Sequence, residues 1–186
     1  VDLSSFYFDI RKDTLYCDDI NSKKRKECII VLNIILECLL KWFAPIFVFT
    51  TDEIYSLVSK DKKNIHEYTF PKIPESWKNN ILDEKWKELF KMKEVANIAI
   101  EEKRASKEIG SSLEADLKIT ADSKKLHILK DIDLAEYFIT SKAEKIESKN
   151  KDELSIKVIK SKGVKCPRCW KVLEKNCDRC EKATNA

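Results

Sequence analysis

The apolar run at residues 28–49, CIIVLNIILECLLKWFAPIFVF, is interrupted only by a few polar residues and by Pro45. Glu37 and Lys41 are four residues apart, which places them on one face of a helix and favours a single solvent-exposed side. In a membrane span the same charges would lie near the bilayer midpoint at a high cost in free energy. We therefore favour the central helix of a helical bundle over a transmembrane helix and expect no membrane partner.

Helical patterns continue on both sides of this run. They predict helices from Ser4 or Ser5 to about residue 18, from about residue 23 to Pro45, from about residue 50, and over residues 83–109. Residues 59–77 contain two prolines and no sustained period, which predicts an irregular connection. Gly110 is expected to stop the last of these helices.

The composition disfavours several fold classes. With 186 residues and 43% hydrophobic residues, the chain can fill a core. Its two glycines are too few for a Gly-rich phosphate loop, a Rossmann turn or a hairpin-rich all-β fold. Thirty-six basic residues against 32 acidic ones give a net charge of +4, which does not by itself indicate nucleic-acid binding.

The pattern changes after Gly110. Leu117 and Ile119 alternate with polar residues, as do Ile156 and Val158 and, more weakly, residues 138–146. Short helical patterns lie between them at residues 122–130 and 133–137. We expect a small α+β subdomain with an antiparallel sheet.

The cysteines fall into two groups. Cys17, Cys28 and Cys38 are scattered in apolar surroundings and are predicted to be buried thiols. The other four form two Cys-x-x-Cys pairs, namely Cys166, Cys169, Cys177 and Cys180. Their spacing predicts a Cys₄ site for structural Zn²⁺, because four thiolates leave no open coordination position. Two disulfides or a redox pair are the alternative, although unpaired cysteines are typical of an intracellular, cytoplasmic setting.

The cysteine module, which we define as residues 162–186, has a basic rim. Between residues 160 and 182 the chain carries eight basic and three acidic residues. With the aromatic Trp170, this rim suits single-stranded RNA, whose bases stack on aromatic rings and whose phosphates bind Lys and Arg. Packing of Trp170 under the module is the alternative. Arg168 and Arg179 lie inside the two Cys-x-x-Cys turns and are predicted to contact RNA.

Three stretches resemble one family. Residues 4–19 (SSFYFDIRKDTLYCDD) and residues 104–117 (RASKEIGSSLEADL) are similar to parts of the class I isoleucyl-, valyl- and leucyl-type tRNA synthetases. The tail with Cys-Pro-Arg-Cys-Trp and a second Cys-x-x-Cys resembles the C-terminal zinc module of bacterial isoleucyl-tRNA synthetases. Thr14 departs from the pattern, since the family usually has Arg there.

The resemblance implies a mainly α fold in three parts: a helical anticodon-binding bundle at residues 1–110, the α+β subdomain at residues 111–161 and the zinc module at residues 162–186. It implies that the four cysteines named above bind zinc and that the module grips the anticodon region of tRNA(Ile). The implied tRNA contacts are Arg168, Trp170, Lys171 and Arg179. A monomer is expected.

The parent enzymes of this family ligate isoleucine to tRNA(Ile) with ATP. Their nucleotide-binding signatures, His-Ile-Gly-His and Lys-Met-Ser-Lys-Ser, are absent from this sequence. We therefore expect no catalytic residue here and a chain that is a C-terminal piece of a longer protein, which also fits Val1 in place of Met. The alternative function is a zinc-ribbon and helical module that docks proteins in an RNA-associated assembly.

Overall fold

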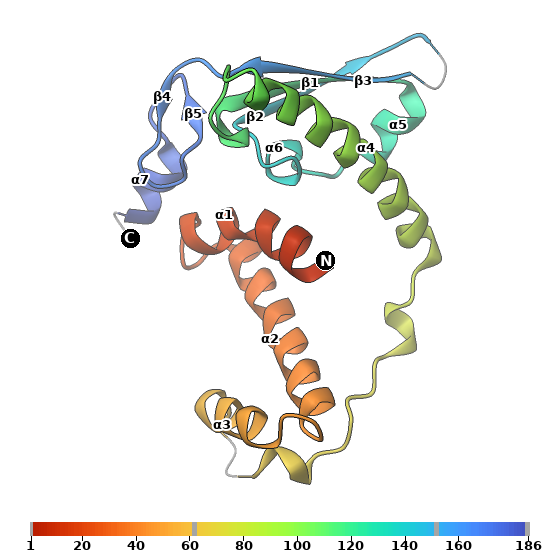
Figure 1. The fold of residues 1–186 in the computed structure, drawn as a ribbon, viewed down its shortest axis with the longest axis vertical. Coiled ribbons are helices and arrows are strands. Elements are labelled where there is room, and N and C mark those ends of the chain that lie inside the picture. The colour runs from red at the N-terminus through yellow and green to blue at the C-terminus, as the bar shows by residue number, and fades with distance from the viewer. Residues whose placement is uncertain (1, 61–62, 151–152, 185–186) are drawn as a thin grey trace. The chain divides into compact units, whose positions relative to one another are not determined.

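The computed structural model describes residues 2–60, 63–150 and 153–184 (Figure 1). The described chain is mainly helical, with a small sheet and a cluster of four cysteines. It divides into two compact units, Val1–Ile20 with Asn80–Ala186, and Asn21–Asn79. This division groups both ends of the chain together, whereas the sequence-based domain boundaries at residues 110 and 161 stay predictions.

In its described residues, 21–60 and 63–79, the unit at residues 21–79 contains two α-helices and two short 3₁₀ turns. They are α2 (Lys23–Phe43), α3 (Val48–Val58), η2 (Ile65–Glu67) and η3 (Glu75–Trp77). Leu40, Ala44 and Ile65 form its buried centre. The Glu37–Lys41 pair expected on one face of α2 is present, with 2.5 Å between Nζ and Oε1. Among the described residues, no helix is long and apolar enough to cross a membrane.

The other unit begins with a short helical stretch at the N-terminus and continues, from Asn80, with a long helix. A π-helical segment, η1 (Asp2–Phe8), leads into α1 (Asp9–Cys17), so the helical conformation begins before Ser4 and Ser5, where the sequence predicted the start of the first helix. Helix α4 (Asn80–Ala105) ends before Gly110. The expected stop at Gly110 is wrong: α4 ends at Ala105, and the chain then turns at Lys107, whose φ of 60° lies in the left-handed region.

The sheet contains three strands in the order β2-β1-β3. They are β1 (Ala115–Ala121), β2 (Lys142–Glu147) and β3 (Leu154–Lys160). Strand β1 pairs antiparallel with β3 but parallel with β2, so the predicted antiparallel sheet is wrong at one edge. The 3₁₀ turn η4 (Ser112–Glu114) precedes β1. Between β1 and β2, the helices α5 (Ser123–Ile128) and α6 (Leu134–Tyr137) return the chain to the end of the sheet where β1 begins, so β2 runs parallel to β1.

The main core lies between the sheet and the helices of this unit. Leu117 and Ile119 of β1 are almost fully buried, as the alternating pattern predicts. They belong to one cluster with Leu89 and Met92 of α4 and with Phe138, which follows α6. Helix α4 also contacts β3, and α6 contacts β2 and α1. The core thus fixes α1 beside the sheet.

The described part of the cysteine module is a hairpin followed by one short helix. Strands β4 (Val164–Lys165) and β5 (Val172–Leu173) pair antiparallel, and α7 (Asp178–Thr184) follows. Gly163 precedes β4 with a φ of 125°, and a Cβ atom there would lie 2.1 Å from the carbonyl oxygen of Leu173. The hairpin therefore needs glycine at this position.

Candidate metal centre and its contacts with helix α1

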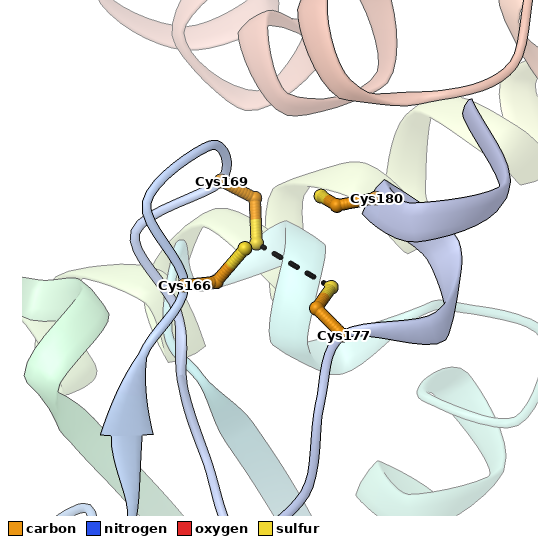
Figure 2. A group of neighbouring side chains, drawn as sticks. All are labelled: Cys166, Cys169, Cys177 and Cys180. Atoms are coloured by element: carbon orange, nitrogen blue, oxygen red, sulfur yellow. Dashed lines mark hydrogen bonds between the residues drawn. The ribbon is translucent and has the colours of Figure 1, made fainter. Parts of the chain in front are cut away.

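The four cysteines of the module come together at one point. The sulfurs of Cys166, Cys169, Cys177 and Cys180 all lie within 4.8 Å of one another (Figure 2). The β4–β5 turn supplies the first pair, while α7 and the residue before it supply the second. Cys166, Cys169 and Cys180 are buried and Cys177 is half-buried. The sequence prediction that these four side chains share one site agrees with this placement.

The turn between Cys166 and Cys169 is held by backbone hydrogen bonds. The amide of Cys166 donates to the carbonyl of Lys171, and the amide of Trp170 donates back to the carbonyl of Cys166, both at 2.9 Å. Trp170 adopts a φ of 65°, which tightens the end of the turn. At the base of the hairpin, the amide of Val172 donates to Ser141 Oγ at 2.7 Å, which ties the module to the start of β2.

The sulfur geometry fits a tetrahedral metal ion. Four thiolates about 2.3 Å from a Zn²⁺ ion are separated by roughly 3.8 Å from one another. Cys169 Sγ and Cys177 Sγ are 3.8 Å apart. All seven cysteines lie in the described part of the chain and are free thiols, so no pair forms a disulfide.

The electrostatic environment of the sulfurs also suits a cation. Burial raises the pKa of Cys166, but backbone amides of Cys169 and Arg168 outweigh it and lower that pKa to about 7. Burial and the neighbouring sulfurs raise the pKa of Cys180. A divalent cation stabilises several adjacent thiolates at once, which protein groups alone do not achieve here. The donor set therefore fits Zn²⁺.

Arg168 faces helix α1. Its guanidinium donates to the carbonyl oxygens of Cys17 at 2.9 Å and of Tyr16 at 3.0 Å. These are terminal carbonyls of α1, which have no partner within the helix. Cys17 Sγ in turn lies 3.8 Å from the carbonyl of Arg168, and Cys17 packs against the cysteine cluster. Arg168 thus caps α1 from within the module.

Arg179 and Lys171 meet on Asp13 of α1. Arg179 donates from Nη1 and Nη2 to the two carboxylate oxygens of Asp13, both at 2.7 Å, and from Nη1 to Asp18 at 3.2 Å. Lys171 Nζ lies 3.4 Å from Asp13 Oδ2. Burial alone would raise the pKa of Asp13, but these two cations hold it below its usual value of 3.8. The hydrogen bonds that Arg179 donates to the Asp13 carboxylate raise the pKa of Arg179, and Cys169 acts in the same direction.

Trp170 behaves differently from its basic neighbours. Its side chain is 60% exposed, so it does not pack under the module. Of the four predicted tRNA contacts, Trp170 is therefore the one that the structure leaves open to solvent, while Arg168, Lys171 and Arg179 contact α1. RNA binding by these four residues stays a prediction.

Helix α1 is also fixed to α6. Thr14 Oγ1 donates to Glu136 of α6 at 2.8 Å, and Arg11 Nη1 lies 3.0 Å from the same carboxylate oxygen. Thr14 is 1% exposed. The residue at which this chain departs from its family pattern is thus a buried link between α1 and α6.

Sequence reasoning missed Asp13 and Glu136. Asp13 is separated from Arg179 by 166 positions, and Glu136 is separated from Thr14 by 122. No local pattern marks either residue, because a lone carboxylate in an amphipathic helix is ordinarily on the surface. A cavity of about 520 Å³ lies beside these contacts, between α1, α6 and the Cys166–Trp170 turn.

Comparison with known proteins places these features in context. A family model described as "Anticodon-binding domain of tRNA ligase" matches residues 1–119. The isoleucine–tRNA ligase of Pelagibacter ubique (strain HTCC1062) is 56% identical over 179 residues, 96% of this chain and 20% of that protein. That of Agrobacterium fabrum is 41% identical over 182 residues, 92% of this chain and 19% of that protein. The chain therefore spans about a fifth of the length of these relatives.

Proposed function

The chain belongs to the family of anticodon-binding domains of tRNA ligases, and on this premise we propose that it binds the anticodon region of tRNA(Ile) as part of an isoleucine–tRNA ligase. The family match over residues 1–119 is the observation that carries this proposal. The relatives named isoleucine–tRNA ligase extend over 92–96% of the chain, so the similarity reaches beyond residues 1–119 and into the cysteine module.

The proposed role of this chain is binding and not catalysis. The ligation of isoleucine to tRNA with ATP belongs to the whole enzyme, and the two nucleotide-binding signatures are absent from this sequence. The helices would form the anticodon-binding bundle, followed by the α+β subdomain and the zinc module. We also propose that the parent enzyme is a cytoplasmic monomer.

We propose Zn²⁺ as the metal of the four-cysteine site. Cys166, Cys169, Cys177 and Cys180 would supply all four ligands, so the ion would be structural. Bound zinc would supply the folding free energy that a short segment with few apolar residues lacks. The residues of the module would then be held in one arrangement against α1.

The exposed Trp170 is our first candidate for an RNA contact in the module. An indole ring open to solvent offers a stacking platform for an unpaired base. Exposed lysines of the module, among them Lys162, Lys175 and Lys182, would bind phosphates nearby. Arg168, Lys171 and Arg179 remain proposed contributors, both through their charge and through their contacts with α1.

A binding titration tests the proposal. The zinc-loaded chain is titrated into a labelled tRNA(Ile) anticodon stem-loop and, as a control, into the same stem-loop with a swapped anticodon. Tighter binding to the native loop, with an affinity that falls steeply as salt rises, is the expected result.

Equal affinity for the two loops would contradict anticodon recognition by this chain. Absent RNA binding, together with a salt-insensitive protein contact, would favour the alternative of a protein-interaction module. A Trp170→Ala variant with retained metal is expected to weaken binding of the native loop several-fold, since stacking on an aromatic ring contributes about 1–3 kcal/mol per base.

A further inference from the structure

The contact between Arg179 and Asp13 has a geometry that sets orientation as well as distance. A guanidinium that donates two parallel hydrogen bonds to one carboxylate fixes the planes of both groups, which a single ion pair does not. Asp13 is 23% exposed and Arg179 35% exposed, so solvent reaches the pair only in part. This pair therefore resists rotation of α7 relative to α1.

A second contact acts at another point of the same helix. Arg168 donates to the terminal carbonyls of α1, about one turn beyond Asp13 along the chain. Arg168 comes from the first Cys-x-x-Cys turn and Arg179 from the second. Each half of the four-cysteine site is therefore attached separately to α1, and together the two attachments define the tilt of the module.

The module has little else to orient it. Within residues 162–184, all of which are described, the buried residues are three cysteines. Besides the contacts with α1, its links to the rest of the unit are the hydrogen bond from Val172 to Ser141, the exposed Lys165–Glu114 ion pair at 3.4 Å and the chain at Ser161–Gly163. A hairpin held at its base by so few contacts can pivot, because no apolar face locks it.

From this arrangement we infer that Asp13 is a positioning residue: through Arg179 it holds the cysteine module in the orientation that presents Trp170 to tRNA. The inference rests on the proposed function of tRNA binding. Asp13 touches no RNA in this account, and it acts only through the orientation of the module. Helix α1, which Thr14 and Arg11 fix to Glu136, supplies the rigid base.

A charge exchange tests this inference. The zinc-loaded chain is compared with three variants, Asp13→Arg, Arg179→Asp and the double variant that carries both changes and restores the net charge. Asp9→Arg is the matched control, because it makes the same charge change on α1 at a residue that pairs with Lys12 of the same helix. Metal content, hydrogen exchange of α7 and affinity for the tRNA(Ile) stem-loop are measured for each.

The single variants are expected to keep one metal ion, to exchange α7 amides faster and to bind the stem-loop about tenfold more weakly than Asp9→Arg, where tenfold corresponds to 1.4 kcal/mol. The double variant is expected to recover part of the slow exchange and part of the affinity, because the exchanged charges would also face Lys171 and Asp18. A direct contact of Asp13 with RNA would not produce recovery when the charges are exchanged, and retained metal separates a loss of orientation from a loss of the module's fold. If Asp13→Arg loses its metal, the smaller change Asp13→Asn replaces it and is expected to weaken binding several-fold with the metal retained.

Two results would overturn the inference. One is equal affinity of Asp13→Arg and Asp9→Arg, and the other is a loss that the double variant does not recover. Failure of the proposed function would be seen in the unmodified chain itself, which would then bind no stem-loop. In that case hydrogen exchange of α7 still decides whether Asp13 orients the module.

Discussion

The sheet and the cysteine module lie next to each other in the chain but are stabilised by different means. In β1, Leu117 and Ile119 are 1% and 0% exposed, and they pack into a core shared with α4 and with Phe138. In residues 162–184, the buried residues are Cys166, Cys169 and Cys180. One region therefore folds through apolar burial, and the other depends on ligand sulfurs and on charged contacts with α1. Damage to one should leave the other largely intact.

The largest expected effect is the loss of a proposed metal ligand. Cys169→Ser should abolish stoichiometric zinc binding, because a structural zinc site contributes about 10–16 kcal/mol in small metal-dependent folds. Circular dichroism and the sheet's hydrogen-exchange protection should change little. The measurements are the zinc content per chain and the amide hydrogen exchange of residues 164–184.

Cys28→Ser is the control for this variant, since Cys28 is equally buried but lies in the other unit. It should keep one zinc ion per chain. Unfolding of the sheet in Cys169→Ser would show that the two regions are not stabilised independently.

A change in the apolar core tests whether the sheet can be destabilised without affecting the cysteine module. Leu117→Ala removes a fully buried side chain from β1 and should lower the free energy of unfolding of the sheet by about 2–5 kcal/mol. Zinc content should stay at one ion per chain. Urea unfolding followed by tyrosine and tryptophan fluorescence gives the first quantity, and a loss of zinc at zero urea would contradict the separation.

A smaller effect is expected at the base of the module. Gly163→Ala places a Cβ atom 2.1 Å from the carbonyl oxygen of Leu173 at a φ of 125°, and should destabilise the hairpin by about 1–3 kcal/mol. The affinity for zinc should fall accordingly. Gly110→Ala is the matched control, because a Cβ there meets only the Glu114 side chain, at 3.4 Å. Equal zinc affinities for the two variants would be evidence against strain at Gly163.

The smallest effect concerns the link between α1 and the rest of the unit. Thr14→Val keeps the side-chain shape but removes the hydroxyl that donates to Glu136, and should lower stability by about 1 kcal/mol. Arg11 would remain beside the Glu136 carboxylate. An unchanged unfolding midpoint would show that Arg11 alone satisfies Glu136.

The sequence predicted those features that repeat at short range. The alternation around Leu117 and Ile119 indicated β1, and the spacing of the two Cys-x-x-Cys pairs indicated one shared site. The pairing of β2 was not predictable in this way, because its parallel direction depends on where α5 and α6 return the chain. The helix stop was misplaced at Gly110, since Lys107 adopts the left-handed conformation that glycine usually takes.

The contacts between the cysteine module and α1 also could not be predicted from local sequence patterns. Arg179 is predicted to contact RNA because it lies inside a Cys-x-x-Cys turn, and this stays a prediction. Its partner Asp13 is 166 positions away and carries no local signal, so only the three-dimensional structure reveals the pair. The resemblance to tRNA ligases was visible in the sequence and agrees with the family match over residues 1–119.

Hydrogen exchange of the chain with zinc and after chelation tests the central claim most directly. Chelation should abolish protection in β4, β5 and α7 and reduce it at the end of α1 that Arg168 caps, while β1 and α4 stay protected. Uniform loss of protection across the sheet, or unchanged protection in α7, would contradict the claim that metal ligation and contacts with α1 hold the module while apolar burial holds the sheet.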